Sequence, residues 1–161
     1  MRCNVKKSKY LIISLALLII DQISKYFVMT NIKLNKSIVI IPNFFKLTYT
    51  NNHGAAFSIL EGKQVLIIII SIIVFIYLLR ELFKGKSDSK LINISISLIL
   101  GGLLGNLIDR IIFNHVRDFL DFSFSKYNFA IFNIGDIGIV VGVILMLIGI
   151  VMEERNANSN K

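Results

Sequence analysis

Four long apolar stretches dominate this sequence and restrict the folds that it can adopt. Each is close to the ~20 residues that an α-helix needs to cross ~30 Å of hydrocarbon. Of the 161 residues, 55% are hydrophobic, more than an ordinary soluble domain carries. We therefore predict an all-α membrane protein, one integral-membrane domain over residues 1–161, with four transmembrane helices at about Tyr10–Val28, Val65–Phe83, Leu91–Ile108 and Ile134–Met152.

The first apolar stretch lies where a secretory signal peptide would lie. A cleaved signal peptide ends in a small-x-small site, and this stretch has none. It also carries Asp21 and Lys25, and further spans follow it. We therefore expect the first span to be retained in the mature protein.

Basic residues predict the orientation of the spans. They crowd the short N-terminus and the short link between the second and third spans, at Arg2, Lys6, Lys7, Lys9, Arg80, Lys84, Lys86 and Lys90. Such segments stay in the cytoplasm, so both termini should be inside and the loops at about 30–64 and 109–133 outside. This bias accounts for the net charge of +8. No basic patch is interleaved with exposed aromatics, so we expect no nucleic-acid partner.

The outer loops carry their own patterns. Ser37–Ile41 and Phe44–Thr50 are rich in β-branched and aromatic residues and flank the Pro42-Asn43 turn, which predicts a small strand-rich element in the first outer loop. The second loop has many aromatics between Phe119 and Phe132. Anchoring at the membrane interface is the simpler interpretation of these aromatics, and a flap that contacts a substrate is the alternative.

Two aspartates stand at the outer ends of the last two spans. Asp118 lies in Val116–Phe119 and Asp136 in Phe132–Asp136. A carboxylate near hydrocarbon is costly unless it is paired, hydrated or protonated, which makes each a candidate for function. The predicted topology brings both to the same depth. Two close carboxylates cannot both ionise, so they would share one proton, as in an aspartic protease.

Other polar residues point toward this region. Asp21 and Lys25 share a helix face, as an ion pair that is structural or that braces a polar site. Small residues on the third span would let another helix approach closely, and small residues on the fourth would let it press against the third. The third span also ends in a polar cluster that we place near one face. The small residues are Gly101 and Gly105 on the third span and Gly135, Gly138 and Gly142 on the fourth. The cluster consists of Gly102, Asn106, Asp109 and Arg110.

Several other chemistries lack the residues that they need. His53 and His115 are the two histidines, and Cys3 is the single cysteine. No His-Glu-x-x-His pattern and no cysteine ligand set is present, so we expect no metal site and no cofactor. No motif suggests a serine nucleophile or a phosphate-binding glycine loop.

Five ordered segments give the chain a resemblance to the bacterial lipoprotein signal peptidases (signal peptidase II), a family of integral-membrane aspartic proteases. The resemblance spans nearly the whole chain, and the five segments together are highly specific. One departure is Gly135, where the family usually has alanine before its second catalytic aspartate. The five segments are Asp21–Lys25, Asn52–Phe57, Gly102–Arg110, Val116–Phe119 and Phe132–Asp136.

The resemblance implies a function and roles for residues. Prolipoproteins carrying a diacylglyceryl-modified cysteine would be the substrates, cut N-terminal to that cysteine at the outer face of the bacterial cell membrane, with membrane lipid as the other partner. Asp118 and Asp136 would be catalytic. Supporting or substrate-binding roles fall to Asn52, Gly54, Asn106, Arg110 and Asn133, and structural polar roles to Asp21, Lys25 and Asp109.

Two alternatives from other classes remain open. A small four-span transporter would use the same aspartates for proton or cation coupling, although transporters place such acids near the midplane of the bilayer. An accessory membrane protein would merely pair its acids with Arg110 and Arg117.

The orientation leads to a labelling prediction. Cysteines introduced at Lys36 and at Ser125 should react with an impermeant reagent added from outside intact cells, because both lie in predicted outer loops. A cysteine at Ser87 should be protected until the membrane is opened. Labelling of Ser87 from outside, with protection of the other two positions, would show that the orientation is inverted.

Overall fold

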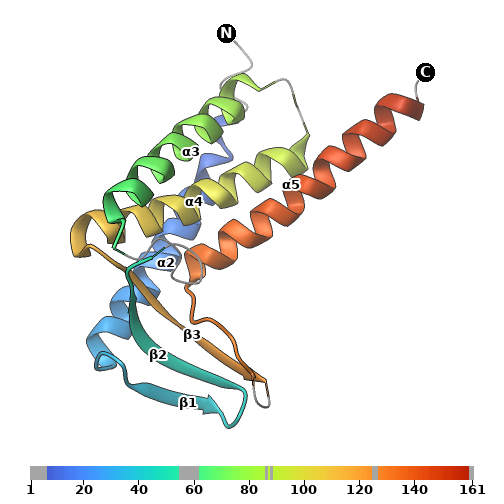
Figure 1. Ribbon diagram of the computed structural model, residues 1–161. Coiled ribbons are helices and arrows are strands. Elements are labelled where there is room, and N and C mark those ends of the chain that lie inside the picture. Colours follow the sequence, from blue (N-terminus) through green and yellow to red (C-terminus); the bar gives the residue numbers. More distant parts are fainter. Residues whose placement is uncertain (1–6, 55–61, 86, 88, 125–126, 160–161) are drawn as a thin grey trace.

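The computed structural model describes residues 7–54, 62–85, 87, 89–124 and 127–159. Within them, four helices are long and apolar enough to cross a membrane, which confirms the predicted fold class. Each helix ends beyond its predicted span, most of all the fourth, which is predicted to end at Met152 and continues to Ser159. The third continues to Phe113, so the polar cluster is part of the helix. The helices are α2 (Leu11–Asn31), α3 (Gln64–Lys84), α4 (Lys90–Phe113) and α5 (Ile134–Ser159) (Figure 1).

Helix α4 is the centre of the bundle. It contacts each of the other three helices. Its most apolar window is 67% buried, against 17–22% for the other helices, so their remaining apolar surfaces are left for lipid. A core of leucine and isoleucine side chains joins α3 to α4, with Leu82 and Leu100 fully covered. The residues on α4 therefore decide how the other helices approach.

Glycines set the close approaches between helices. A Cβ on Gly102 would collide with the backbone oxygen of Gly135, so α4 and α5 meet backbone to backbone at this level. Gly142 similarly faces Ile99 of α4. The expectation that all three small residues of α5 face α4 is wrong for Gly138, which packs against Leu17 of α2 because helical spacing turns it away from the other two.

The two loops that we predict to lie outside form one antiparallel sheet. Its strands are β1 (Ser37–Ile41), β2 (Phe45–Asn52), β3 (Val116–Phe124) and β4 (Tyr127–Asn128), in the order β1-β2-β3-β4. The strand-rich element of the first loop is confirmed. The sequence patterns did not indicate that the aromatic segment of the second loop pairs with it. Phe122 of that segment stacks on Phe45 with ring centroids 4.6 Å apart.

The sheet lies at the end of the bundle opposite the start of α2 and the end of α5 (Figure 1). Asn114 ends α4 in the left-handed region, with φ of 61°, and turns the chain directly into β3. Pairing of β2 with β3 sets Thr50 opposite Asp118 and Asn52 opposite Val116. The sheet register therefore brings Asn52, Asp118 and the start of α5 to one level.

Candidate active site

Strand β3 holds Asp118 in the interior. Val116 and Phe119 on either side of it are buried, and Asp118 itself is 1% exposed. Two amides satisfy its carboxylate. Asn52 Nδ2 donates to Oδ2 at 2.9 Å, and Asn133 Nδ2 donates to Oδ1 at 2.6 Å. Because both oxygens accept a hydrogen bond, Asp118 is held in one orientation.

Asp136 is fixed by the start of α5. The backbone N–H of Asp136 donates to Asn133 Oδ1 at 2.9 Å, and the N–H of Asn133 donates back to Asp136 Oδ2 at 3.2 Å. This reciprocal arrangement is a capping box, which satisfies otherwise unpaired donors at a helix N-terminus. The other carboxylate oxygen of Asp136 accepts from Asn106 Nδ2 at 2.8 Å.

Asn106 and Asn133 bridge the two aspartates. Asn133 Nδ2 donates to Asp118 Oδ1 and also to Asn106 Oδ1, the latter at 3.1 Å. Asn106 in turn donates to Asp136. Both carboxylates line one cavity of about 650 Å³. The expected meeting of Asp118 and Asp136 is therefore found in the fold, through residues of α4, β3 and the start of α5.

The surroundings make Asp118 a weak acid. Burial, followed by the negative charge of Asp136, raises the pKa of the Asp118 carboxyl to about 7. The hydrogen bonds from Asn52 and Asn133 oppose this rise because they stabilise the ionised form. A pKa of about 7 lets the pair carry one shared proton at neutral pH.

A buried ion network lies beside the pair. Lys25 Nζ is 2.8 Å from Asp21 Oδ2 and 3.4 Å from Asp109 Oδ2. Arg117 Nη2 reaches Asp109 Oδ1 at 2.6 Å. Arg117 also donates to Gln22 Oε1 at 2.9 Å, so it joins β3 to α2 and α4. Opposite charges and hydrogen bonds together make such burial tolerable.

Gln22 and Arg117 hold places in this network that no sequence pattern assigned to them. The alternation of a strand gives a partial signal for Arg117, since it must face away from Asp118. The predicted single face of the α4 cluster is also divided. Gly102 and Asn106 contact α5, Asp109 is bound to Arg117, and Lys25 reaches both Asn106 and Asp109. Successive side chains of β3 point to opposite faces, so Arg117 lies on the face away from Asp118 and pairs with Asp109.

Arg110 lines the cavity one turn beyond Asn106. Its Nη2 donates to the carbonyl of Gly54 at 2.9 Å, and its Nη1 to the carbonyl of Asn106 at 3.3 Å. The N–H of Gly54 donates to Asn52 Oδ1 at 2.9 Å, which ties this segment to the amide that holds Asp118. Residues Ala55–Phe57 of the same motif lie outside the described residues.

Apolar walls extend the cavity away from the carboxylates. They come from α3, α5 and the segment before α5. The two helices make no more than marginal contact with each other, since their packing partner is α4. The apolar lining includes Ile67, Ile70, Leu103, Ile131, Phe132, Ile137, Ile139, Val140 and Val141.

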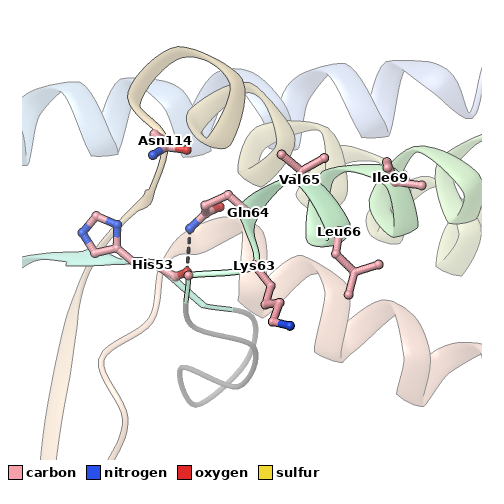
Figure 2. A pocket seen from close by; sticks show the side chains of 8 residues that line it. His53, Lys63, Gln64, Val65, Leu66, Ile69 and Asn114 are labelled. Carbon is pink, nitrogen blue, oxygen red and sulfur yellow. Dashed lines mark hydrogen bonds between the residues drawn. The ribbon is translucent and has the colours of Figure 1, made fainter.

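A second cavity, of about 820 Å³, lies at the start of α3 (Figure 2). Gln64 Nε2 donates to the carbonyl of His53 at 2.6 Å across it. None of its described lining residues is an acid. The described residues also contain no cluster of three acidic, histidine or cysteine side chains that would hold a metal ion. Of the two cavities, the one lined by Asp118 and Asp136 therefore has the groups for acid–base chemistry.

Comparison with known proteins gives a consistent result. Residues 13–152 match the family model described as signal peptidase (SPase) II. The lipoprotein signal peptidase of Listeria welshimeri is 39% identical over 155 residues, which cover 94% of this chain and 99% of that protein. That of Clostridium tetani is 39% identical over 138 residues, covering 85% and 88%. That of Staphylococcus aureus is 38% identical over 146 residues, covering 91% and 90%.

Solved structures agree with these relatives. A bacterial membrane enzyme determined by the in meso method at 2.3 Å superposes with a TM-score of 0.86 at 37% identity, covering 92% of this chain and 91% of that one. A second, at 1.9 Å, gives a TM-score of 0.80 at 38% identity, covering 89% and 92%.

The raised pKa of Asp118 predicts a titration near neutral pH. In detergent, the ¹³C carboxyl signal that disappears in Asp118→Asn should titrate at about pH 7 rather than near the ~4 of an ordinary aspartate. Because folding raises this pKa, the carboxyl contributes to the stability of the folded protein at pH values below its pKa in the unfolded chain. This contribution is lost as the pH rises through about 7. Asp118→Asn should lack this part of the pH dependence of unfolding. Titration near pH 4 would refute the electrostatic account.

Proposed function

Because the chain belongs to the signal peptidase II family of membrane aspartic endopeptidases, we propose that it removes the signal peptides of prolipoproteins, cutting N-terminal to a diacylglyceryl-modified cysteine. The single observation that supports this most is the bridged pair of Asp118 and Asp136 in one cavity. Two buried carboxylates that share a proton supply both the acid and the base that peptide hydrolysis needs.

Hydrolysis proceeds without a covalent intermediate. The ionised member of the pair takes a proton from a bound water while the protonated member donates a hydrogen bond to the scissile carbonyl. Water oxygen adds to the carbonyl carbon while the protonated member transfers its proton to the carbonyl oxygen, and a gem-diol forms. The C–N bond then breaks as the proton taken from water passes to the departing amine, and a gem-diol hydroxyl returns a proton to the other carboxylate. The proton belongs to the pair as a unit, because strongly coupled carboxylates titrate together.

The polar groups around the pair orient the reacting atoms. Asn52 and Asn133 hold Asp118, and Asn106 holds Asp136, so neither carboxylate has to reorganise during the reaction. Arg110 borders the same cavity and is 8% exposed, so its guanidinium can bind a substrate carbonyl there. Gly54 supports Arg110 through its carbonyl.

The apolar part of the cavity suits a substrate that is itself a membrane helix. It is lined by Ile67 and Ile70 on α3 and by Val140 and Val141 on α5. A signal peptide could enter between these helices from the bilayer and keep its apolar residues out of water. The scissile bond then reaches the aspartates at the end of the helices, which we place at the outer face by the charge of the cytoplasmic segments.

The positions of the charged residues argue against the two alternatives. Asp136 is in the first turn of α5 and Asp118 is on a strand, so neither is at the midplane where a transporter binds its ions. An accessory role would pair Asp118 and Asp136 with the arginines. Arg117 is instead bound to Asp109 and Gln22, and Arg110 to backbone carbonyls.

The shared-proton mechanism predicts the effect of neutral substitutions. Asp118→Asn and Asp136→Asn should each lower cleavage of a lipidated precursor by ~10² or more, because each removes one proton-transfer group. The purified variants should keep the helical content of the wild type. Wild-type cleavage should continue in EDTA, since no step uses a metal. Near-normal turnover by either variant would exclude the mechanism.

The proposed substrate predicts a strong dependence on lipid. Each buried methylene contributes ~0.8 kcal/mol to membrane anchoring, so a diacylglyceryl group should hold the cleavage site at the depth of the aspartates. A precursor with the modified cysteine should therefore be cut far faster than the same precursor with a free cysteine. The measurement is a side-by-side rate in lipid mesophase. Equal rates would indicate a broader membrane protease.

A further inference from the structure

Lys25 has a set of contacts that an ion pair alone does not require. Its ammonium lies 2.8 Å from Asp21 Oδ2, 3.4 Å from Asp109 Oδ2 and 2.9 Å from Asn106 Oδ1. The side chain is fully buried. An ammonium has three N–H donors, and three acceptors surround it here. One of the three is the side chain that binds Asp136.

The contact with Lys25 determines which way the Asn106 amide points. Asn106 Oδ1 accepts from Lys25 Nζ and from Asn133 Nδ2, so its own NH₂ group is directed to Asp136 Oδ1. Rotation of the amide by half a turn would set NH₂ against two donors and the carbonyl oxygen against a carboxylate. Without Lys25, one of the two contacts that prevent this rotation is lost.

Lys25 also balances the charges beside the aspartates. Its own cluster has two acids, Asp21 and Asp109, and two cations, Lys25 and Arg117. Among the described residues, the remaining charged groups that line the cavity from α4, β3 and α5 are Arg110, Asp118 and Asp136. Loss of Lys25 would leave one unbalanced negative charge next to a pair that already carries one.

We propose that Lys25 is a positioning residue for the carboxylate pair, which it serves by orienting Asn106 toward Asp136 and by supplying the positive charge that keeps one member of the pair ionised. This inference rests on the proposed function and extends it. It gives Lys25 a role in catalysis, which specifies the second of the two interpretations of the Asp21–Lys25 pair, a structural ion pair or a brace for a polar site. The attraction of Lys25 also lowers the pKa of Asp118, against the larger effect of burial.

The test compares Lys25→Met with two matched variants. Methionine keeps the length of the side chain without its charge. Lys25→Met should lower kcat roughly 10²-fold, as expected for a misplaced reacting group, while the KM for a lipidated precursor changes little. The acid limb of its pH–rate profile should move to higher pH. Lys25→Arg should restore part of the wild-type profile, and Lys33→Met, which removes an exposed lysine just beyond α2, should behave as wild type.

A double variant separates orientation from charge. Asp21→Asn with Lys25→Met removes one acid and one cation, so the cluster stays balanced and the protein avoids an unpaired buried charge. Its ¹³C titration of Asp118 should return toward the wild-type value, while kcat stays low because Asn106 is not held. Wild-type kcat in this variant, or an unshifted pH profile and unshifted Asp118 titration in Lys25→Met, would overturn the proposal.

The titration keeps this inference distinct from the proposed function. If the wild-type protein failed to cut the lipidated precursor, the proposed function would fall. The shift of the Asp118 titration in Lys25→Met would still show whether Lys25 controls the charge of the pair.

Discussion

The Asn133 side chain makes the contacts on which the rest of the site depends. It is fully buried, and its two ends serve different elements. The carbonyl oxygen caps α5 by accepting from the backbone of Asp136, and the NH₂ group reaches Asp118 on β3 and Asn106 on α4. One amide thus joins a helix start, a strand and a second helix. Both carboxylates take their position from this junction.

Buried polar side chains satisfy backbone donors at the start of α5. At the start of α5, Asp21 Oδ1 accepts the N–H of Gly135 at 2.8 Å, and Asn133 and Asp136 satisfy two more backbone donors. A methyl group at Gly135 would lie 3.1 Å from Asn133 Oδ1 and 3.2 Å from Asp21 Oδ1. The family's usual alanine would therefore need shifts of a few tenths of an ångström here. Hydrogen bonds on both sides restrain the flexibility that glycine brings.

The same helices form the apolar walls of the cavity and hold the polar residues at its end. Because α4 is central and contacts every other helix, α3 and α5 stay apart and leave their facing surfaces to the cavity. The sheet at the end of the bundle brings Asn52 and Asp118 over this cavity. For the reaction centre that we propose, this arrangement would admit a substrate from the bilayer without a cleft in water.

The sequence by itself determined the number and approximate place of the spans and the strands of the first loop, because long apolar runs and β-branched alternation are each compatible with few structures. It also singled out Asp118 and Asp136 as candidates for function, because charges near hydrocarbon are costly. Only the tertiary structure decided that the second loop pairs with the first, that Gly138 faces α2, and that Arg117 and Gln22 complete the network of Asp109. These features depend on the register between strands and on the rotation of each helix. The strand register and the helix rotation are set by contacts between residues that are distant in the chain, so local sequence patterns do not predict them.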